Sequence, residues 1–175
     1  ALLCMFNGKV LSCAVDGIEA GSTTFGHRFM APDALKIDKA DDYLSKLEQA
    51  YVIADKTKRE AVILEKTKGL AAAEDLVLVD DAGLLAEVAG LVEWPVPLMG
   101  QIDDAFMDVP EEVLVSVMRT HQKYLALRDK SGQLAPRFIT IANIETADNG
   151  AKIIAGNERV LRARLSDARF FWDED

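Results

Sequence analysis

Two clusters of side chains in this sequence could carry chemistry. Gly26-His27-Arg28-Phe29 places an imidazole and a guanidinium beside a glycine, and Arg119-Thr120-His121-Gln122-Lys123-Tyr124 places Arg, His, Gln and Lys beside an aromatic ring. Arginine and lysine bind phosphates, glutamine and histidine hydrogen-bond to base edges, and an aromatic ring can stack on a base. Both clusters are therefore typical of contact with an anion or with RNA. A simpler interpretation of each cluster stays open. The first cluster also fits a turn anchored by Phe29, and the second cluster also fits the polar end of a helix with Tyr124 in the core.

The sequence contains no pattern of a self-contained catalytic or metal site. His27 and His121 are its two histidines, they lie far apart, and neither has the spacing of a metal-ligand pair. Glycine-rich phosphate loops and the Gly-x-Ser-x-Gly nucleophile motif are missing. The paired acids Asp80-Asp81 and Asp103-Asp104 are most simply turn and helix-start residues. We therefore predict no catalytic residues, no metal and no cofactor in this chain.

Charge is distributed unevenly along the chain. Residues 119–172 hold ten Lys and Arg against five Asp and Glu, whereas residues 1–118 hold ten against twenty-one. Polyanion contact is therefore predicted in the C-terminal third, although a basic face that only balances an acidic one is equally compatible with these counts. The candidates for polyanion contact also include four arginines of the last predicted helix. Three lie on one flank of the apolar stripe of this helix, Arg159, Arg162 and Arg169, and Arg164 lies on the opposite flank.

Hydrophobic periodicity predicts the elements that position these side chains. Asn7-Gly8 favours a tight hairpin between strands at residues 1–6 and 10–16, and the period becomes helical from Ala40. Pro95 is expected to stop the helix before it, and Pro110 to open the next one. The other predicted elements are helices at 55–73, 81–92 and 150–172, a buried strand at 76–79, and a hairpin of strands 123–128 and 137–144.

These elements predict one α/β or α+β domain over residues 1–175, with a mixed, partly antiparallel sheet and packed helices. The helical element at 150–172 could lead into a next domain. No apolar run approaches the ~20 residues of a membrane span, no signal peptide opens the chain, and Cys4 and Cys13 are expected to be reduced, buried thiols. We therefore expect a cytoplasmic location. The abrupt ends, without an initiator Met, predict a segment of a longer protein.

Several segments together resemble one family. The sequence resembles the β subunit of the bacterial, two-subunit type of glycyl-tRNA synthetase over essentially its whole length, and the closing residues 162–171 fit as well. No single motif is diagnostic, but the ordered set is specific. The segments are Gly26-His27-Arg28-Phe29, Leu91-Val92-Glu93-Trp94-Pro95, Val109-Pro110-Glu111-Glu112-Val113-Leu114, His121-Gln122-Lys123-Tyr124 and Gly156-Asn157-Glu158-Arg159-Val160-Leu161.

The resemblance implies a division of labour between subunits. In this family the α subunit carries the class II active site with ATP and Mg²⁺, and the longer β subunit chiefly binds tRNA within an α2β2 heterotetramer. This segment would lie in the N-terminal half of the β subunit, before its HD-type domain, and would be similar in arrangement to the editing domain of the phenylalanyl-tRNA synthetase β subunit. Its implied partners are the α subunit and the tRNA for glycine, with no membrane and no DNA, and alone it should be inactive.

Three hypotheses about the role of the segment follow. The first is a non-catalytic module that contacts tRNA. The second is an assembly module that docks the α subunit or other β domains through Trp94-Pro95 or Phe170-Phe171-Trp172. The third and least favoured is hydrolysis of mischarged tRNA, for which only His27 or His121 could activate water. The RNA-contact candidates are His27, Arg28, Arg119, His121, Gln122, Lys123, Arg159, Arg162, Arg164 and Arg169.

Overall fold

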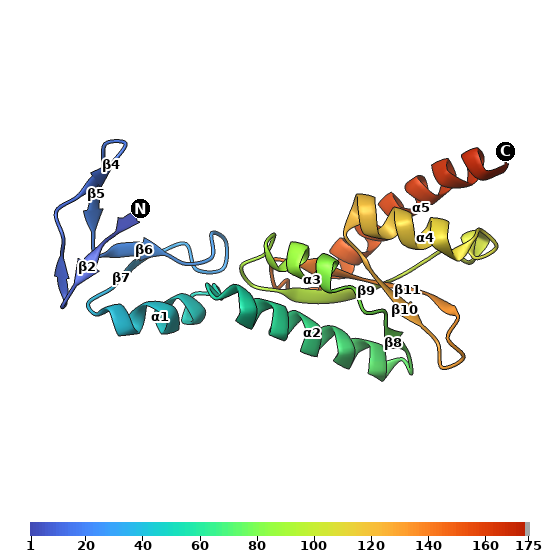
Figure 1. The fold of residues 1–175 in the computed structure, drawn as a ribbon, viewed down its shortest axis with the longest axis horizontal. Coiled ribbons are helices and arrows are strands. Elements are labelled where there is room, and N and C mark those ends of the chain that lie inside the picture. The colour runs from blue at the N-terminus through green and yellow to red at the C-terminus, as the bar shows by residue number, and fades with distance from the viewer. Residues whose placement is uncertain (174–175) are drawn as a thin grey trace. The chain divides into compact units, whose positions relative to one another are not determined.

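The computed structural model describes residues 1–173, so the last two residues of the predicted domain lie outside it (Figure 1). Contacts divide the chain into two compact units, Ala1–Arg59 (unit 1) and Glu60–Asp175 (unit 2). The single domain expected over residues 1–175 stays a prediction, because two compact units with their own contacts can fold together or apart.

Unit 1 opens with short strands in three small sheets. β1 and β5 pair in parallel, β4 adds to β5 in the antiparallel sense, and β2–β3 and β6–β7 are antiparallel pairs. The Asn-Gly turn predicted from the sequence is confirmed: Asn7 and Gly8 have φ of 48° and 73° between paired β2 and β3. The strands are β1 (Leu2–Leu3), β2 (Met5–Phe6), β3 (Lys9–Val10), β4 (Ala14–Val15), β5 (Ile18–Gly21), β6 (Thr23–Phe25) and β7 (Ala34–Lys36).

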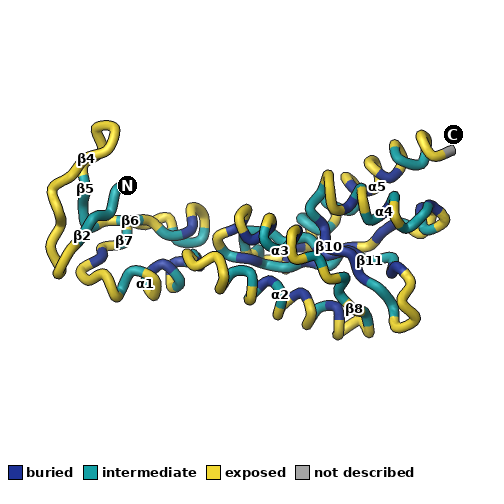
Figure 2. The backbone as a smooth tube through the Cα atoms, viewed as in Figure 1, coloured by how far each residue is buried: buried dark blue, intermediate teal, exposed yellow. Residues whose placement is uncertain are grey.

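The buried side chains of unit 1 come late in its sequence. The 3-10 turn η1 (Ala40–Asp42) leads into helix α1 (Tyr43–Gln49), and the buried apolar residues are Ile37, Leu47, Ala50 and Ile53. Not one residue of the fully described stretch 1–26 is buried, and Figure 2 draws β2 to β5 without the colour of buried residues. The two cysteines follow this pattern, since Cys4 is half-buried and Cys13 is exposed. The prediction of buried thiols was therefore wrong.

Unit 2 is built around one antiparallel sheet in the order β8-β10-β11-β9. This sheet with its helices confirms the mixed α/β class. The elements from residue 56 on are α2 (Lys56–Ala73), β8 (Val77–Leu78), α3 (Ala82–Ala89), β9 (Val96–Gln101), η2 (Asp104–Phe106), α4 (Glu111–Val117), the π-helical turn η3 (Met118–Gln122), β10 (Leu125–Arg128), β11 (Leu134–Ala142) and α5 (Ala151–Asp173).

The sheet of unit 2 has a hydrophobic cluster on each face. Neighbouring strand residues point to opposite faces, so Phe138 joins one cluster and Ile139 the other. The Phe138 cluster includes Leu114 of α4 and Leu161 of α5, whereas the Ile139 cluster includes residues of α2 and α3. The helices thus cover the sheet as two layers, α4 and α5 on one side and α2 and α3 on the other (Figure 1).

Three sequence predictions needed correction in this unit. The strand expected to be buried at residues 76–79 is β8, in which Val77 is exposed and Leu78 is half-buried. The stretch around Pro95 and Pro97 was expected only to end a helix, yet β9 begins at Val96 and pairs with β11 along its length. A proline is tolerated there because β9 is an edge strand, where one side needs no ladder hydrogen bond. Helix α3 ends at Ala89, before the predicted residue 92, because Gly90 follows as its C-cap. None of the described helices is long and apolar enough to span a membrane.

Candidate functional site

The His27 side chain is part of the interior of unit 1. It is 2% exposed, and its Nδ1 accepts hydrogen bonds from the backbone N–H groups of Phe29 (3.3 Å) and Met30 (3.2 Å). Its own backbone N–H donates to the carbonyl oxygen of Ala50 at 2.8 Å. Gly26 approaches Ala50 so closely that a Cβ would lie 2.4 Å from the Ala50 Cβ. His27 therefore holds this loop against the end of α1.

Arg28, the neighbour of His27, lies at the surface. Its guanidinium carbon is 5.7 Å from the centroid of the Phe29 ring, and that ring is 72% exposed. The structure thus separates two residues that the sequence grouped as one cluster. Arg28 can reach a phosphate, whereas the contacts of His27 favour the turn that was the simpler interpretation.

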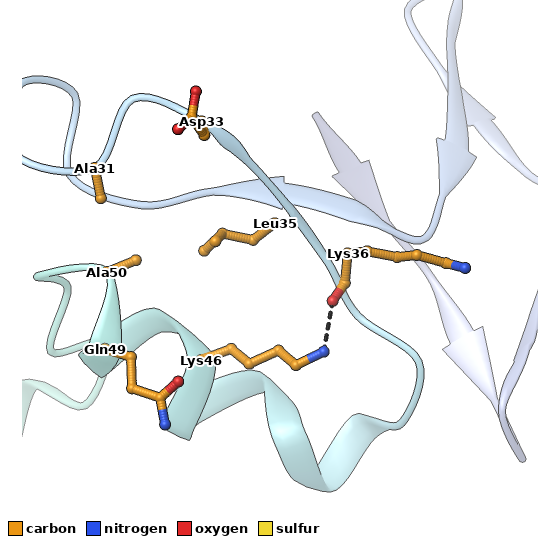
Figure 3. A pocket seen from close by; sticks show the side chains of 7 residues that line it. All are labelled: Ala31, Asp33, Leu35, Lys36, Lys46, Gln49 and Ala50. Carbon is orange, nitrogen blue, oxygen red and sulfur yellow. Dashed lines mark hydrogen bonds between the residues drawn. The ribbon is translucent and has the colours of Figure 1, made fainter.

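An open cavity of about 410 Å³ lies beside this loop (Figure 3). Leu35 of β7 points between Ala31 and Ala50, and Lys46 of α1 donates a hydrogen bond to the carbonyl oxygen of Lys36 at 2.7 Å. The volume suits a small ligand. The lining residues include no Ser, Cys or His, so they offer no nucleophile paired with an imidazole. They are Ala31, Asp33, Leu35, Lys36, Lys46, Gln49 and Ala50. Sequence analysis missed this cavity because a loop, a strand and a helix build it through tertiary contacts.

In unit 2, two basic side chains of the 119–124 motif bind carboxylates, one at the N-cap of α3 and one within this helix. Arg119 Nε lies 2.6 Å from Asp81 Oδ2, and Lys123 Nζ lies 2.8 Å from Glu87 Oε1. Asp81 also caps α3, because its Oδ1 accepts from the backbone N–H of Leu84 at 2.8 Å. The hydrogen bond from Arg119 is the largest cause that holds the pKa of Asp81 below its usual range. The ion pairs of Arg119 and Lys123 therefore hold η3 against α3.

The π-helical turn η3 decides which side chains of this motif face solvent. Lys123 ends the turn in the left-handed region, with φ of 59°, and the backbone N–H of Tyr124 donates to the Met118 carbonyl oxygen at 3.0 Å. Tyr124 thereby turns into the core, where its ring stacks on Phe138 at 4.5 Å between centroids. His121 is left exposed and Gln122 half-exposed. A single π-turn of this kind is frequent at functional sites.

The buried Tyr124 also connects η3 to the last helix. Its hydroxyl donates to Asn157 Oδ1 at 2.5 Å, and Asn157 Nδ2 donates back to the Ile153 carbonyl oxygen at 2.7 Å. Burial raises the pKa of Tyr124 to about 12. The simpler interpretation of this residue, a core tyrosine, is confirmed.

The arginines of α5 fall into two groups. Arg162 Nε lies 3.2 Å from Asp103, and Arg169 binds the carboxylate of Asp108 and the carbonyl oxygen of Ala105, so both tie α5 to η2 and its flanks. Within the part of the chain that the structure describes, the side chains of Arg159 and Arg164 make no ion pair or hydrogen bond, and both residues are exposed. Arg164 follows Asn157 by seven residues, which is about two helical turns, and so shares its flank.

Five of the ten candidate side chains therefore reach solvent and pair with no carboxylate among the described residues: Arg28, His121, Gln122, Arg159 and Arg164. Surface ion pairs contribute little to the free energy of folding, so the four candidates that pair with a carboxylate can exchange it for another anion. The carboxylates nevertheless reduce the positive potential around these four side chains. Among the described residues, no group of three or more His, Cys, Asp or Glu could hold a metal ion.

Comparison with known proteins identifies the family. A family described as "Glycyl-tRNA synthetase beta subunit" matches residues 1–175. The chain belongs to this family. Relatives named glycine–tRNA ligase beta subunit are 59% identical over 158 residues in Rhodospirillum centenum, 52% over 176 in Phenylobacterium zucineum and 49% over 179 in a Ruegeria species. These alignments cover 90%, 99% and 100% of this chain but only 22%, 26% and 26% of the relatives. The resemblance noted from the sequence motifs is thus confirmed, and the chain spans about a quarter of the length of glycyl-tRNA synthetase beta subunits.

Proposed function

We propose that this chain is a non-catalytic module of the β subunit of a glycine–tRNA ligase. It supports the charging of glycine tRNA through contact with the tRNA and through the architecture of the subunit. The observation that carries the proposal is the family match over residues 1–175, with 49–59% identity to three glycine–tRNA ligase beta subunits.

The proposal assigns the chemistry to the partner subunit. It places a class II active site, ATP and Mg²⁺ on the α subunit of a cytoplasmic α2β2 enzyme, and it assigns no chemical step to residues of this chain.

Arg159 and Arg164 are the strongest candidates for direct tRNA contact. Both are exposed on α5 without a carboxylate partner among the described residues, so their charges are available to phosphates. Arg164 shares a flank with Asn157, which the Tyr124 hydroxyl links to the η3 segment that exposes His121. Arg159 lies on the other flank of the apolar stripe of α5, so the two arginines would bind separate phosphates of an RNA stem, largely without regard to sequence.

Salt dependence of tRNA binding to the complete α plus β enzyme tests this proposal. The double variant Arg159→Gln with Arg164→Gln should bind glycine tRNA more weakly, and the slope of log affinity against log salt should shrink by about one to two. The matched control is Arg162→Gln with Arg169→Gln, which removes the same charge from arginines that bind Asp103 and Asp108. Unchanged affinity and slope in the first variant, with a change in the control, would overturn the assignment.

Assembly is the second candidate function, favoured by a different observation. Phe170, Phe171 and Trp172 at the end of α5 are 58%, 68% and 54% exposed. If they dock the α subunit or another β domain, Phe171→Ser should weaken co-purification of the subunits while tRNA binding by the assembled enzyme stays unchanged. Loss of tRNA affinity without loss of assembly would contradict that role.

We also propose that the fold is related to the editing-type domain of the phenylalanyl-tRNA synthetase β subunit. A mixed α/β structure with small antiparallel sheets supports this relation. Hydrolytic editing itself is the weakest candidate, because the His27 side chain is buried and its Nδ1 already accepts hydrogen bonds from backbone N–H groups. Deacylation assays with a His121→Ala enzyme test it, and a rate equal to wild type would exclude His121 as the residue that activates water.

A further inference from the structure

The β2–β3 hairpin of unit 1 brings the two cysteines of the chain together. The carbonyl oxygen of Cys4 accepts a hydrogen bond from the backbone N–H of Leu11 at 3.0 Å, which extends the pairing of β2 with β3 by one residue pair. In an extended chain, residues two apart point to the same side. Cys13 follows Leu11 by two residues, so its side chain points to the side on which Cys4 lies.

The two thiols are in contact, as this register requires. They form a hydrogen bond, which raises the pKa of Cys13 above its usual value. The carbonyl oxygen of Cys13 accepts from the backbone N–H of Ala20 at 2.8 Å, so each cysteine is also fixed by a backbone hydrogen bond of its own. All of these contacts are internal to unit 1. Both thiols are free in this structure.

We propose that Cys4 and Cys13 form a redox site that reacts with small disulfides and closes to an intramolecular disulfide. Glutathione disulfide is a co-substrate of the required class. Two protein thiols and one small disulfide give one protein disulfide and two small thiols, so the two electrons that the protein loses reduce the co-substrate.

The reaction consists of two exchange steps. In the first, the thiolate of one cysteine attacks a sulfur of the small disulfide, and a mixed disulfide forms as one small thiolate leaves and takes up a proton. In the second, the thiolate of the other cysteine attacks the protein sulfur of the mixed disulfide and releases the second small thiol. The second step joins groups that are already neighbours, so its effective concentration is high.

Closure of the disulfide would change the stability of the hairpin. The strands β1 to β4 have only two residues each, so few ladder hydrogen bonds hold this part of unit 1 together. The disulfide closes a loop of ten residues, from Cys4 to Cys13, and such a cross-link removes conformations from the unfolded chain. The oxidised site therefore holds the β2–β3 hairpin more firmly than the reduced one.

The experiment incubates the full-length β subunit and the α subunit with glutathione disulfide in mildly alkaline buffer, because the thiolate is the attacking species. Acid stops the exchange, and the remaining thiols are blocked. Trypsin then cleaves after Lys9, between the cysteines, so the disulfide appears as two joined peptides in the mass spectrum. We expect joined peptides to exceed glutathione adducts of either cysteine by at least about tenfold. No tRNA is present, so this result does not depend on the proposed tRNA contact.

An exchange of two neighbouring residues supplies the matched control. The double variant Ser12→Cys with Cys13→Ser keeps the composition but moves the thiol to the side of the chain that points away from Cys4. It should give at least about tenfold less of the joined peptides in the folded enzyme, and as much as wild type in denaturant. Circular dichroism before oxidation verifies that this variant is folded. Cys4→Ala is a second control, which should give glutathione adducts of Cys13 and no joined peptides.

Two outcomes would overturn the inference. Joined peptides in equal amounts from wild type and from the folded double variant would show that closeness in the sequence, and not the hairpin register, links the cysteines. Free thiols or glutathione adducts without joined peptides in the folded wild type would show that the two thiols do not react with each other.

Discussion

At the residue scale, His27 illustrates how a side chain suited to chemistry can serve the backbone instead. Its type and its place beside Gly26 predicted anion contact, whereas its Nδ1 accepts two backbone hydrogen bonds within the same turn. The simpler interpretation of a turn was open from the sequence, but burial decides between the two and no local pattern shows it. The core position of Tyr124 was likewise an open alternative, which its contact with Phe138 settles.

Replacement of His27 tests its structural role. His27→Ala leaves the N–H groups of Phe29 and Met30 without their acceptor, and unfolding free energy should fall by about 1–3 kcal/mol. Urea unfolding measures this loss, with the exposed Arg28→Ala as the control that should change stability by less than about 0.5 kcal/mol. Full stability of His27→Ala combined with weaker tRNA binding would contradict the structural role.

Two glycines of unit 2 form a second test at this scale. A Cβ at Gly100 would lie 2.4 Å from Cζ of the fully buried Phe138, so Gly100→Ala should destabilise the protein by about 1–3 kcal/mol. Gly156, inside α5, has no heavy atom within 4 Å of such a Cβ. Gly156→Ala should therefore stabilise by about 0.5–1 kcal/mol. Thermal unfolding compares the two, and equal effects would show that the packing around Phe138 is looser than described.

Tyr124 predicts a pH dependence in the alkaline range. Burial raises its pKa from 10.0 to about 12 in the folded chain, so between these values the unfolded state loses the proton first. Its contribution to stability is complete below pH 10 and is lost as pH rises through about 12. Urea unfolding at pH 9 and pH 11.5 should show a steeper loss for wild type than for Tyr124→Phe. Identical losses would mean that Tyr124 titrates normally.

At the element scale, local signals predicted elements better than they predicted contacts. The Asn7-Gly8 pair correctly predicted the β2–β3 hairpin, and the helical period near the end of the chain correctly predicted α5. These two elements could be predicted because each depends on residues that are close together in the sequence. Strand β9 was missed because its prolines mark a loop in any local window, and only its place at a sheet edge makes Pro97 tolerable. The partners of Arg119 and Arg169 lie 38 and 61 residues away, beyond any spacing rule.

Asp81 links two elements, and two substitutions separate its roles. Asp81→Asn keeps a cap for α3 but removes the charge that Arg119 binds, whereas Asp81→Ala removes both. Loss of the cap should cost about 1 kcal/mol, so Asp81→Ala should be the less stable variant in urea. Equal stability of the two variants would contradict the capping role.

The same pair predicts behaviour in acid. Because Arg119 lowers the pKa of Asp81, the stabilisation is present above pH 3.8, the unfolded value, and is lost as pH falls through the lower folded value. Arg119→Met should raise the pKa of the Asp81 carboxyl towards 3.8, which NMR titration of that carboxyl measures. An unchanged titration in this variant would mean that the contact does not persist in solution.

At the scale of the whole molecule, the order of the expected helices and strands predicted the mixed α/β class, and the sequence motifs predicted the family. The sequence does contain an excess of basic residues from Arg119 on. Four of the candidate cations, however, form ion pairs with acidic residues elsewhere in unit 2: Arg119, Lys123, Arg162 and Arg169. Charge counts along a sequence cannot show this, since the pairing depends on the fold. The chain also spans only about a quarter of the length of these relatives, so contacts made by the rest of such a protein cannot be predicted from this sequence.

Site-specific photo-crosslinking to glycine tRNA tests the central claim most directly. A benzoylphenylalanine in place of Ala163, an exposed residue of α5 between Arg159 and Arg164, should crosslink to the tRNA in the complete α plus β enzyme. The control replaces Glu65, an exposed residue of α2, which covers the opposite face of the sheet. The account predicts a crosslink at position 163, competed by unlabelled glycine tRNA, and none at 65. A crosslink at 65 without one at 163, or none at either while the tRNA stays bound, would contradict it.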